Sequence, residues 1–511
     1  MSVERRGSVP SEQGLKTDKR MNASAAKPED SGKAISTEPQ AGSSGNGFSP
    51  KHSGNSAGSG RSLIRGLFPW ARKGGLAVLD QGLISGSNFV ISVLLARWLM
   101  PDQYGAYAVA FGIYVMLSLV YQSLLLEPMG VFGGSIFRSN LRGYMRSLVS
   151  IYVAFSIAIC SALVIAWAVA RHLNPGGAIT SALAGIAVAS PCLMLFSLAR
   201  RTFYVELSPA PAAIGAFIYA SVVLAGLYVV YQHALLSPFV AFLLIGGGAL
   251  VTGAVLMFGL RSGLSGSGPA PAFREAWRRH WRYGRWALAS CVAGWLPSYV
   301  YFPLLSSFKG MAESGQLKAL MNLTMPFEQT KGALIMLFLP YAARVMEQQG
   351  KAGARILGIR LTLLSVCLAI AYWAVIIPLH KPVFHLLYSG RYMEVAYLLP
   401  ALAFGQIFWS GTFGPSVALR AMESPSSVFV ALGFATVASL LIGVPATWAF
   451  GLKGAIWGSN MADIFSLVAL LLVLRRKLST RGSADLPSRP GWLGATGEAR
   501  RPVRLEIPEE T

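Results

Sequence analysis

The stretch Pro211-Ala-Ala-Ile-Gly-Ala-Phe-Ile-Tyr-Ala-Ser-Val-Val-Leu-Ala-Gly-Leu-Tyr-Val-Val-Tyr231 contains no charged side chain along its whole length. A helix of about 20 apolar residues is long enough to cross about 30 Å of hydrocarbon. A charged side chain at the centre of a bilayer costs about 2.5–3.5 kcal/mol, so membrane spans exclude charge. The stretch therefore predicts a transmembrane helix, and the same pattern recurs along most of the chain.

The composition is also that of a chain folded mainly in lipid. Of the 511 residues, 53% are hydrophobic and only 13% are charged, and the mean hydropathy is +0.51. Soluble globular proteins carry about 25% charged residues. The apolar runs predict an all-α polytopic membrane protein with about twelve transmembrane helices. The predicted spans are 75–97, 105–127, 148–170, 178–199, 211–231, 237–260, 286–307, 317–342, 356–379, 396–419, 426–449 and 454–474.

The positive charge is distributed unevenly between the two sides of the predicted membrane. The formal net charge is +22, with 44 Lys and Arg residues. With both termini in the cytoplasm, 36 of these lie on the cytoplasmic side, 7 lie on the other side, and Lys331 lies within a span. Cytoplasmic loops of membrane proteins carry such an excess of Lys and Arg. The charge therefore indicates a multi-pass protein with cytoplasmic N- and C-termini, in the inner membrane if the source is a bacterium. No nucleic-acid partner is expected.

The predicted spans fall into two groups of six. Two equal groups joined by a basic link are common in secondary transporters and predict two six-helix lobes. The N-terminal tail is rich in Ser, Gly, Ala and Lys, cannot bury a core, and is expected to be disordered. The expected domains are a cytoplasmic tail at 1–74, an N-terminal lobe at 75–260, a cytoplasmic link at 261–285, a C-terminal lobe at 286–477 and a second cytoplasmic tail at 478–511.

The link carries an amphipathic pattern. Phe273, Trp277 and Trp281 recur every four residues, and each is followed by an arginine. This spacing places the aromatic rings on one helix face with a cationic flank beside them. Such a helix is expected along the cytoplasmic lipid interface, either as a topological anchor or to capture an anionic lipid headgroup.

Three short motifs occur in order along the chain. They are Leu95-Ala-Arg-Trp-Leu-Met-Pro-Asp-Gln-Tyr-Gly-Ala-Tyr107, Leu387-Tyr-Ser-Gly-Arg-Tyr392 and Gly451-Leu-Lys-Gly-Ala-Ile-Trp-Gly458. Together they resemble signatures of the bacterial polysaccharide biosynthesis proteins, the oligosaccharide flippases of the multidrug/oligosaccharidyl-lipid/polysaccharide exporter superfamily. Met100 stands where that family usually has Gly, and Asp102 stands for Glu. The resemblance covers about residues 70–477 and leaves out both tails.

The resemblance implies a transporter rather than an enzyme. Its substrate would be an undecaprenyl-pyrophosphate-linked oligosaccharide, moved from the cytoplasmic to the outer leaflet for O-antigen, capsule or exopolysaccharide assembly. The two lobes would surround a central cavity that opens alternately to each side. Partners would be membrane lipids, a polysaccharide polymerase and export machinery. No metal or other cofactor is expected, and the coupling ion would be H⁺ or Na⁺.

The first motif also has a direct structural interpretation. Arg97 ends the first span, where it either reaches the outer interface or contacts substrate. Pro101 stops the helix, and Gly105 permits a tight re-entry into the membrane. Tyr104 and Tyr107 are expected to form an aromatic belt at the interface.

Ionisable side chains inside spans are the first candidates for a transport site, because they are costly in lipid. Glu328 and Lys331 share a helix face and follow Pro326, which is expected to kink the helix. We interpret Lys331 as a phosphate contact, with Glu328 as its counter-ion or as a proton-coupling group. An internal salt bridge that locks the lobes is one alternative, and a pair at the membrane interface is another. Asp80 and Asp463 are further ion-coupling candidates, unless Asp80 pairs with nearby basic residues and Asp463 only packs.

Other candidates lie nearer the span ends. Ser298 and Tyr299 offer hydroxyls to sugars on the seventh span, or to neighbouring helices. Arg138, Arg142 and Arg146 are four residues apart, so they are expected to line one face at the cytoplasmic mouth. There they would either recruit a diphosphate or set the topology.

Three rival functions remain open from the sequence. A membrane glycosyltransferase or polymerase needs acidic residues outside, and the only external acids are Asp102, Glu313 and Glu394, far apart in the chain. A cation-coupled drug antiporter of the same superfamily would favour acids in its cavity, whereas Lys331 favours an anionic substrate. A lipid II flippase of that superfamily usually has helices beyond twelve. No GxxxxGK[ST] motif for ATP binding is present.

Overall fold

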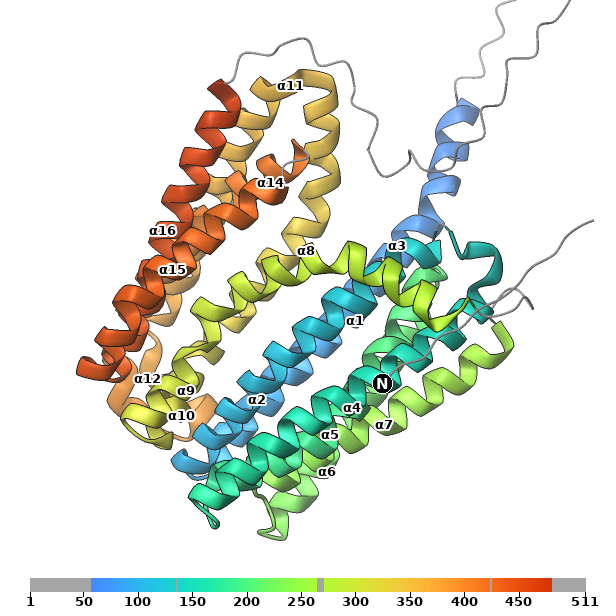
Figure 1. Ribbon diagram of the computed structural model, residues 1–511. Helices are drawn as coiled ribbons and strands as arrows, with labels where there is room; N and C mark the ends of the chain where they lie inside the picture. The colour runs from blue at the N-terminus through green and yellow to red at the C-terminus, as the bar shows by residue number, and fades with distance from the viewer. Residues whose placement is uncertain (1–56, 135, 264–270, 423–424, 480–511) are drawn as a thin grey trace, which may run out of the picture. The chain divides into compact units, whose positions relative to one another are not determined.

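The computed structural model describes residues 57–134, 136–263, 271–422 and 425–479, so most of each predicted tail lies outside it. Every regular element in these ranges is a helix (Figure 1), as predicted for an all-α membrane protein. The described residues from 62 onward belong to one compact unit. In the described residues, ten helical segments are long and apolar enough to cross a membrane, and each overlaps one of the predicted spans.

In the first half, α5 is the centre of the packing and contacts its neighbours on several sides. The elements are α1 (Ala57–Trp98), α2 (Pro101–Tyr121), the π-helical turn η1 (Gln122–Leu126), α3 (Glu127–Gly134), the 3₁₀ turn η2 (Arg138–Asn140), α4 (Leu141–Leu173), α5 (Ala178–Val205), α6 (Pro209–Gln232) and α7 (Pro238–Gly263). α5 packs against α2, α4, α6 and α7. Small residues allow this, since a Cβ on Gly246 would lie 2.7 Å from the Ala189 Cα. We call α1–α7 the N-terminal group.

In the second half, α16 has the corresponding role. The elements are α8 (Phe273–Tyr299), α9 (Tyr301–Phe308), α10 (Met311–Asn322), α11 (Met325–Ile376), α12 (His380–Tyr388), the 3₁₀ turn η3 (Met393–Leu398), α13 (Leu399–Gly411), α14 (Phe413–Ala421), α15 (Pro425–Phe450) and α16 (Leu452–Ser479). α16 packs against α13 and runs beside α15 (Figure 1). A Cβ on Gly454 would lie 1.9 Å from the Ala446 carbonyl oxygen. We call α9–α16 the C-terminal group.

The other two predicted spans, 317–342 and 396–419, are divided helices in the structure. The span 317–342 is divided between α10 and α11, and the span 396–419 between α13 and α14. Pro326 stands in the first turn of α11, where its missing N–H has no intrahelical partner to lose. The predicted span is thus interrupted at Leu323 and Thr324, just before Pro326, in line with the break in the helix that this proline predicts. The break in α11 is at Gly350, whose φ of 61° favours glycine.

α8 joins the two groups by packing on both. It contacts η1, α3 and α4 of the N-terminal group and α15 and α16 of the C-terminal group. Its buried seam is Ala276, His280 and Gly284, one residue in each turn. Gly284 has to be small, because a Cβ there would lie 2.4 Å from the Ser123 carbonyl oxygen.

His280 anchors this seam to the N-terminal group. Its Nδ1 donates to the Leu124 carbonyl oxygen at 2.9 Å, and the Tyr144 hydroxyl donates to Nε2 at 2.7 Å. The carbonyl can only accept, so these two bonds fix the neutral tautomer. Leu124 lies in η1, and π-helical turns often mark functional positions. Burial lowers the pKa of His280 to about 4, so the ring is uncharged at neutral pH.

The predicted aromatic stripe of the link lies away from this seam. Phe273 and Trp281 are 48% and 46% exposed. Trp277 is half-buried, and its ring centre lies 5.9 Å from that of Phe155. The aromatic and arginine stripes therefore face outward, and the seam that holds α8 in place is made of residues that the sequence pattern did not single out.

Candidate functional site

Glu328 and Lys331 lie at the start of α11 and form a cluster with Trp409 of α13. The Lys331 Nζ is 3.6 Å from the Glu328 Oε2 and 4.1 Å from the centre of the Trp409 ring. The Trp409 indole N–H donates to the same carboxylate oxygen at 3.2 Å. Lys331 is only 6% exposed. The arrangement combines an ion pair with a cation–π contact in a buried place.

Asp463 of α16 adds a second carboxyl group. It interacts electrostatically with both Lys331 and Glu328. Asp463 also lines a cavity of about 40 Å³, whose other polar lining residues are Tyr301, Thr324, Gln406, Ser459 and Asn460. That volume has room for a few water molecules or one small cation. Hydroxyl, amide and carboxylate oxygens are the ligands that hard cations prefer.

Several polar atoms of this cluster are buried without a hydrogen-bond partner among the described residues. They are the Glu328 Oε1, the Lys331 Nζ and the Gln406 Oε1. A buried polar group costs about 1–3 kcal/mol when it stays unsatisfied. Water, an ion or a polar substrate would therefore be stabilised at this junction of α11, α13 and α16.

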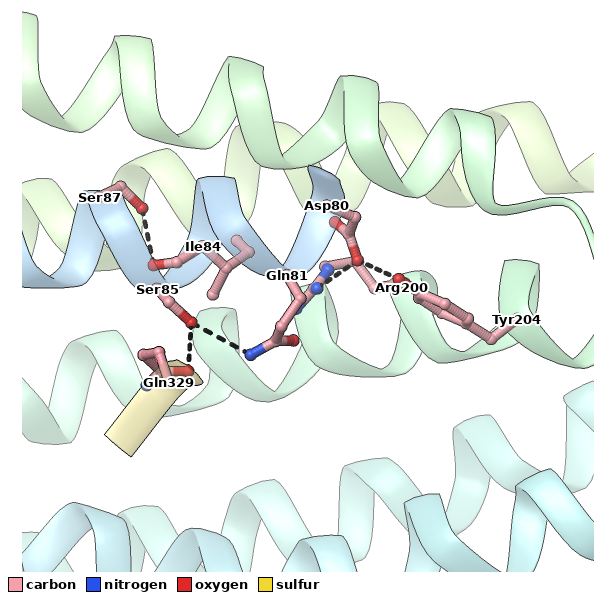
Figure 2. A network of polar contacts seen from close by, with 8 residues as sticks. All are labelled: Asp80, Gln81, Ile84, Ser85, Ser87, Arg200, Tyr204 and Gln329. Carbon is pink, nitrogen blue, oxygen red and sulfur yellow. Dashed lines mark hydrogen bonds and ion pairs between the residues drawn. The ribbon is translucent and has the colours of Figure 1, made fainter. Parts of the chain in front are cut away.

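Asp80 is fully buried in α1 and is already paired with α5 (Figure 2). The Arg200 Nη2 lies 2.5 Å from the Asp80 Oδ2, and the Tyr204 hydroxyl donates to the same oxygen. α5 continues past the predicted end of its span at residue 199, which brings Arg200 onto the helix. Among the described side chains, the cationic partner of Asp80 is thus Arg200.

A short polar chain connects this pair to the C-terminal group. Figure 2 shows the Ser85 hydroxyl of α1 donating to the Gln329 Oε1 of α11, at 2.8 Å. The Gln81 amide donates to the Ser85 oxygen at 3.2 Å. Gln81 follows Asp80, and Gln329 follows Glu328. The two ionic clusters are therefore linked through adjacent residues of α1 and α11.

Tyr104 and Tyr107 are buried, at 0% and 4% exposure, so the prediction of an aromatic belt there is wrong. The Asn322 amide donates to the Tyr104 hydroxyl at 2.9 Å, and the Ser92 hydroxyl donates to the Asn322 Oδ1 at 2.9 Å. The Tyr104 hydroxyl then donates to the Ser92 oxygen at 3.0 Å, which closes a ring of three bonds. This ring joins α1 and α2 to α10.

Gly105 lies inside α2 and does not make the re-entry turn that the sequence suggested. A Cβ on Gly105 would lie 1.7 Å from the Met311 carbonyl oxygen of α10. A Cβ on Gly315 would lie 2.8 Å from the Pro101 carbonyl oxygen. The two glycines therefore let the backbones of α2 and α10 touch, next to the hydrogen-bonded ring.

The remaining predicted arginines are not part of the cluster of Glu328, Lys331, Trp409 and Asp463, which we call the C-terminal cluster. Arg97 is exposed in the last turn of α1, about 25 Å along that helix from Asp80. Arg138 is exposed in η2, so it leaves the helix face that it was expected to share with Arg142. Arg142 lies on α4, at a groove between α4 and α7.

Of the predicted hydroxyls, Tyr299 lies near the C-terminal cluster, because it interacts electrostatically with Glu328. The side chain of Ser298 lies outside the described part of the structure. Sequence reasoning missed Trp409, Gln406 and Arg200. A polar signal was present for Gln406, which interrupts an otherwise apolar run, but nothing local indicates that Trp409 faces Lys331.

The fold is similar to that of several solved transporters at low sequence identity. A multidrug-resistance transporter of the MATE family and the MOP superfamily, in an inward-facing conformation, aligns with a TM-score of 0.67 at 12% identity, over 78% of this chain and 94% of that one. The lipid II flippase MurJ, in an inward closed conformation, aligns with a TM-score of 0.62 at 12% identity, over 78% and 87%. A MATE family transporter in an outward-facing conformation gives 0.57 at 12% identity, over 80% and 95%. No family model and no curated protein sequence matches the chain.

Proposed function

We propose that this chain moves an undecaprenyl-pyrophosphate-linked oligosaccharide across the inner membrane of a bacterium, from the cytoplasmic to the outer leaflet. The observation that carries the proposal is Lys331, a buried ammonium group whose Nζ has no hydrogen-bond partner among the described residues. A bound phosphate would supply the missing charge-assisted hydrogen bonds. The likeness in fold to a lipid II flippase supports a lipid-linked substrate. The product would serve O-antigen, capsule or exopolysaccharide assembly, with a polymerase and export machinery as partners.

Transport would proceed by alternating access between an N-terminal and a C-terminal lobe. The contact between Gly105 and Gly315 joins α2 to α10 on one side of the protein. We assign this closed side to the outer face, because the likeness is greater to an inward-facing transporter, with a TM-score of 0.67, than to an outward-facing one, with 0.57. The α2–α10 contact and the Tyr104 ring would have to open for the oligosaccharide to leave.

Asp463 would couple transport to H⁺ or Na⁺. Its carboxylate interacts with Lys331 and with Glu328, so its charge sets the electrostatic balance within that pair. A proton or Na⁺ bound in the adjoining cavity of about 40 Å³ would neutralise Asp463 and change the affinity of Lys331 for an anion. Tyr299, near Glu328, would offer its hydroxyl to a sugar.

A cation-coupled drug antiporter is the second candidate. Two carboxylates, Glu328 and Asp463, lie near the same cavity, and the Glu328 Oε1 has no hydrogen-bond partner among the described residues. A cationic drug would be attracted to these groups, and two of the similar structures are multidrug-resistance transporters. The sign of the substrate charge therefore separates the two functions.

The test is made in a strain that lacks the protein. Polyprenyl-pyrophosphate-linked oligosaccharide and surface polysaccharide are measured after complementation with wild type, Lys331→Ala or Lys381→Ala. Lys381 is an exposed lysine of α12 and serves as the matched control. We expect the uncomplemented strain to accumulate the lipid-linked repeat and lose surface polymer. Lys381→Ala should restore both levels, and Lys331→Ala should not, at equal protein abundance.

Other outcomes would contradict the proposal. Unchanged intermediates and normal polymer in the deletion strain would remove the flippase function for that pathway. The drug antiporter would be favoured instead if the deletion strain became more sensitive to cationic dyes. In that case Lys331→Ala should restore resistance to the dyes and Glu328→Gln should not.

A further inference from the structure

A groove lies between α4 and α7 of the N-terminal group, and none of its lining residues belongs to the cluster around Lys331. It is an open groove with a volume of about 680 Å³. Four residues of α4, from Arg142 to Val149, and four of α7, from Ala254 to Leu260, line it. Volumes of about 300–1,000 Å³ are typical of ligand sites in proteins. α5 packs against both helices and holds them in place.

The charged end of the groove is built by the first turns of α4. Arg142 and Arg146 are one turn apart, so they lie on the same helix face and both line the groove. The opposite face of these turns is buried, with Tyr144 fully enclosed against His280. The backbone that carries the two arginines is thus fixed, and the positive end of the α4 helix dipole lies beside them.

The rest of the groove is apolar. Its lining includes Met145 and Val149 of α4 and Ala254, Met257 and Leu260 of α7. None of the eight described lining residues is acidic. Methionine side chains adapt to the irregular shape of flexible apolar ligands.

The position of the groove matches the boundary between lipid headgroups and hydrocarbon. α4 and α7 belong to the candidate membrane spans Arg138–Leu173 and Pro238–Leu260. The arginines lie at the start of the first span, and the α7 lining residues lie at the end of the second. An apolar channel with two cations at a span end is complementary to an anionic lipid. The cations match its negatively charged headgroup, and the apolar lining matches its acyl chains.

We propose that this groove is a binding site for one anionic glycerophospholipid of the surrounding bilayer. The phosphate lies between Arg142 and Arg146, and an acyl chain lies along the apolar lining toward Ala254. None of the lining residues belongs to the Lys331 cluster, so the site does not depend on the function proposed above.

The experiment uses the full-length protein, purified in detergent and stripped of lipid. Binding of phosphatidylglycerol and phosphatidylcholine is titrated by native mass spectrometry. R142Q/R146Q removes the charges, and A254W fills the groove with the charges intact. R138Q is the matched control, because Arg138 is exposed in η2 and does not line the groove. Inorganic phosphate is added as a competitor that lacks acyl chains.

Each basic residue near a membrane surface contributes a factor of about five in affinity for anionic lipid. We therefore expect one phosphatidylglycerol per protein, held about 30-fold more tightly by wild type and R138Q than by R142Q/R146Q. A254W should also lose the bound lipid, and millimolar phosphate should not displace it from wild type.

Four results would overturn the proposal. The first is an affinity for phosphatidylcholine equal to that for phosphatidylglycerol, and the second is unchanged phosphatidylglycerol binding by R142Q/R146Q or by A254W. The third is a loss of binding in R138Q equal to that in R142Q/R146Q. The fourth is tighter binding of a polyprenyl phosphate than of phosphatidylglycerol. If R142Q/R146Q does not give a monodisperse protein, A254W and R138Q decide the result.

Discussion

Replacing Gly105 by alanine would test how closely α2 and α10 are joined. The added Cβ would lie 1.7 Å from the Met311 carbonyl oxygen and 2.6 Å from its carbonyl carbon. This oxygen belongs to helix backbone, so it cannot rotate away as a side chain would. To restore an ordinary contact, the two helices would have to separate by about 1.5–2 Å.

The cost follows from the contacts that such a separation disturbs. Overpacking of a well-packed core costs about 1–3 kcal/mol. Tyr104, the residue before Gly105, would also lose its 2.9 Å bond from Asn322, and a neutral hydrogen bond contributes about 1 kcal/mol. The total of about 2–4 kcal/mol would shift the population away from the closed α2–α10 contact by at least about 30-fold.

The chain offers a matched control in the same helix. A Cβ on Gly112 would meet its nearest atoms, in Tyr299 and Phe302, at 3.7 and 3.9 Å. These are ordinary van der Waals distances, so Gly112→Ala should leave the packing unchanged.

The assay measures access to the closed contact from water. Ser92, which is 3% exposed, is replaced by cysteine in a protein whose four native cysteines have been replaced. We expect a water-soluble maleimide to react at least about 30-fold faster when Gly105→Ala is added, and at the original rate with Gly112→Ala. Equal rates in all three proteins, or equal acceleration by Gly112→Ala, would refute the reasoning.

Three further results are expected. Arg200→Met removes the cation that pairs with the buried Asp80 carboxylate and leaves it the Tyr204 hydroxyl, so it should lower the stability by about 3–5 kcal/mol. A melting temperature that recovers in the Asp80→Asn/Arg200→Met double variant would support this cause, and no recovery would contradict it. His280 has a pKa lowered by burial to about 4, so the unfolded chain binds its proton first as the pH falls. The free energy of unfolding should then fall by about 3 kcal/mol between about pH 6.5 and pH 4. The melting temperature of His280→Gln should not show this part of the fall with pH. Asp463→Asn should abolish the stimulation of lipid-linked oligosaccharide transport by an ion gradient in proteoliposomes while substrate binding persists, and continued stimulation would exclude Asp463 as the coupling group.

The apolar runs were enough to predict the fold class, because the requirement to exclude charge acts on each span by itself. The two divided spans escaped that reasoning, since an interrupted helix has the same composition as a continuous one. Pro326 illustrates the limit, because proline is compatible with a kink and with a first turn, and only the position of the helix start decides between them.

The candidate site was predicted only where it is local in sequence. Glu328 and Lys331 are three residues apart, so helix geometry alone places them together. Trp409 comes from another helix, and its contact with Lys331 depends on how α11 packs against α13. Tyr104 was assigned to the lipid interface because an aromatic residue near a span end faces either lipid or protein. The burial of its hydroxyl with Asn322 shows that it faces protein.

The seam at Gly284 makes α8 a lever arm. From Gly284 to the end of α8 at Tyr299 the helix extends about 22 Å, at 1.5 Å per residue. A tilt of about 10° at the seam would swing that far end by about 4 Å over this length. Tyr299 lies within electrostatic range of Glu328, so the lever ends beside the buried ion pair. A small rotation of α8 on the His280 anchor would thus be magnified into a displacement at the charged cluster.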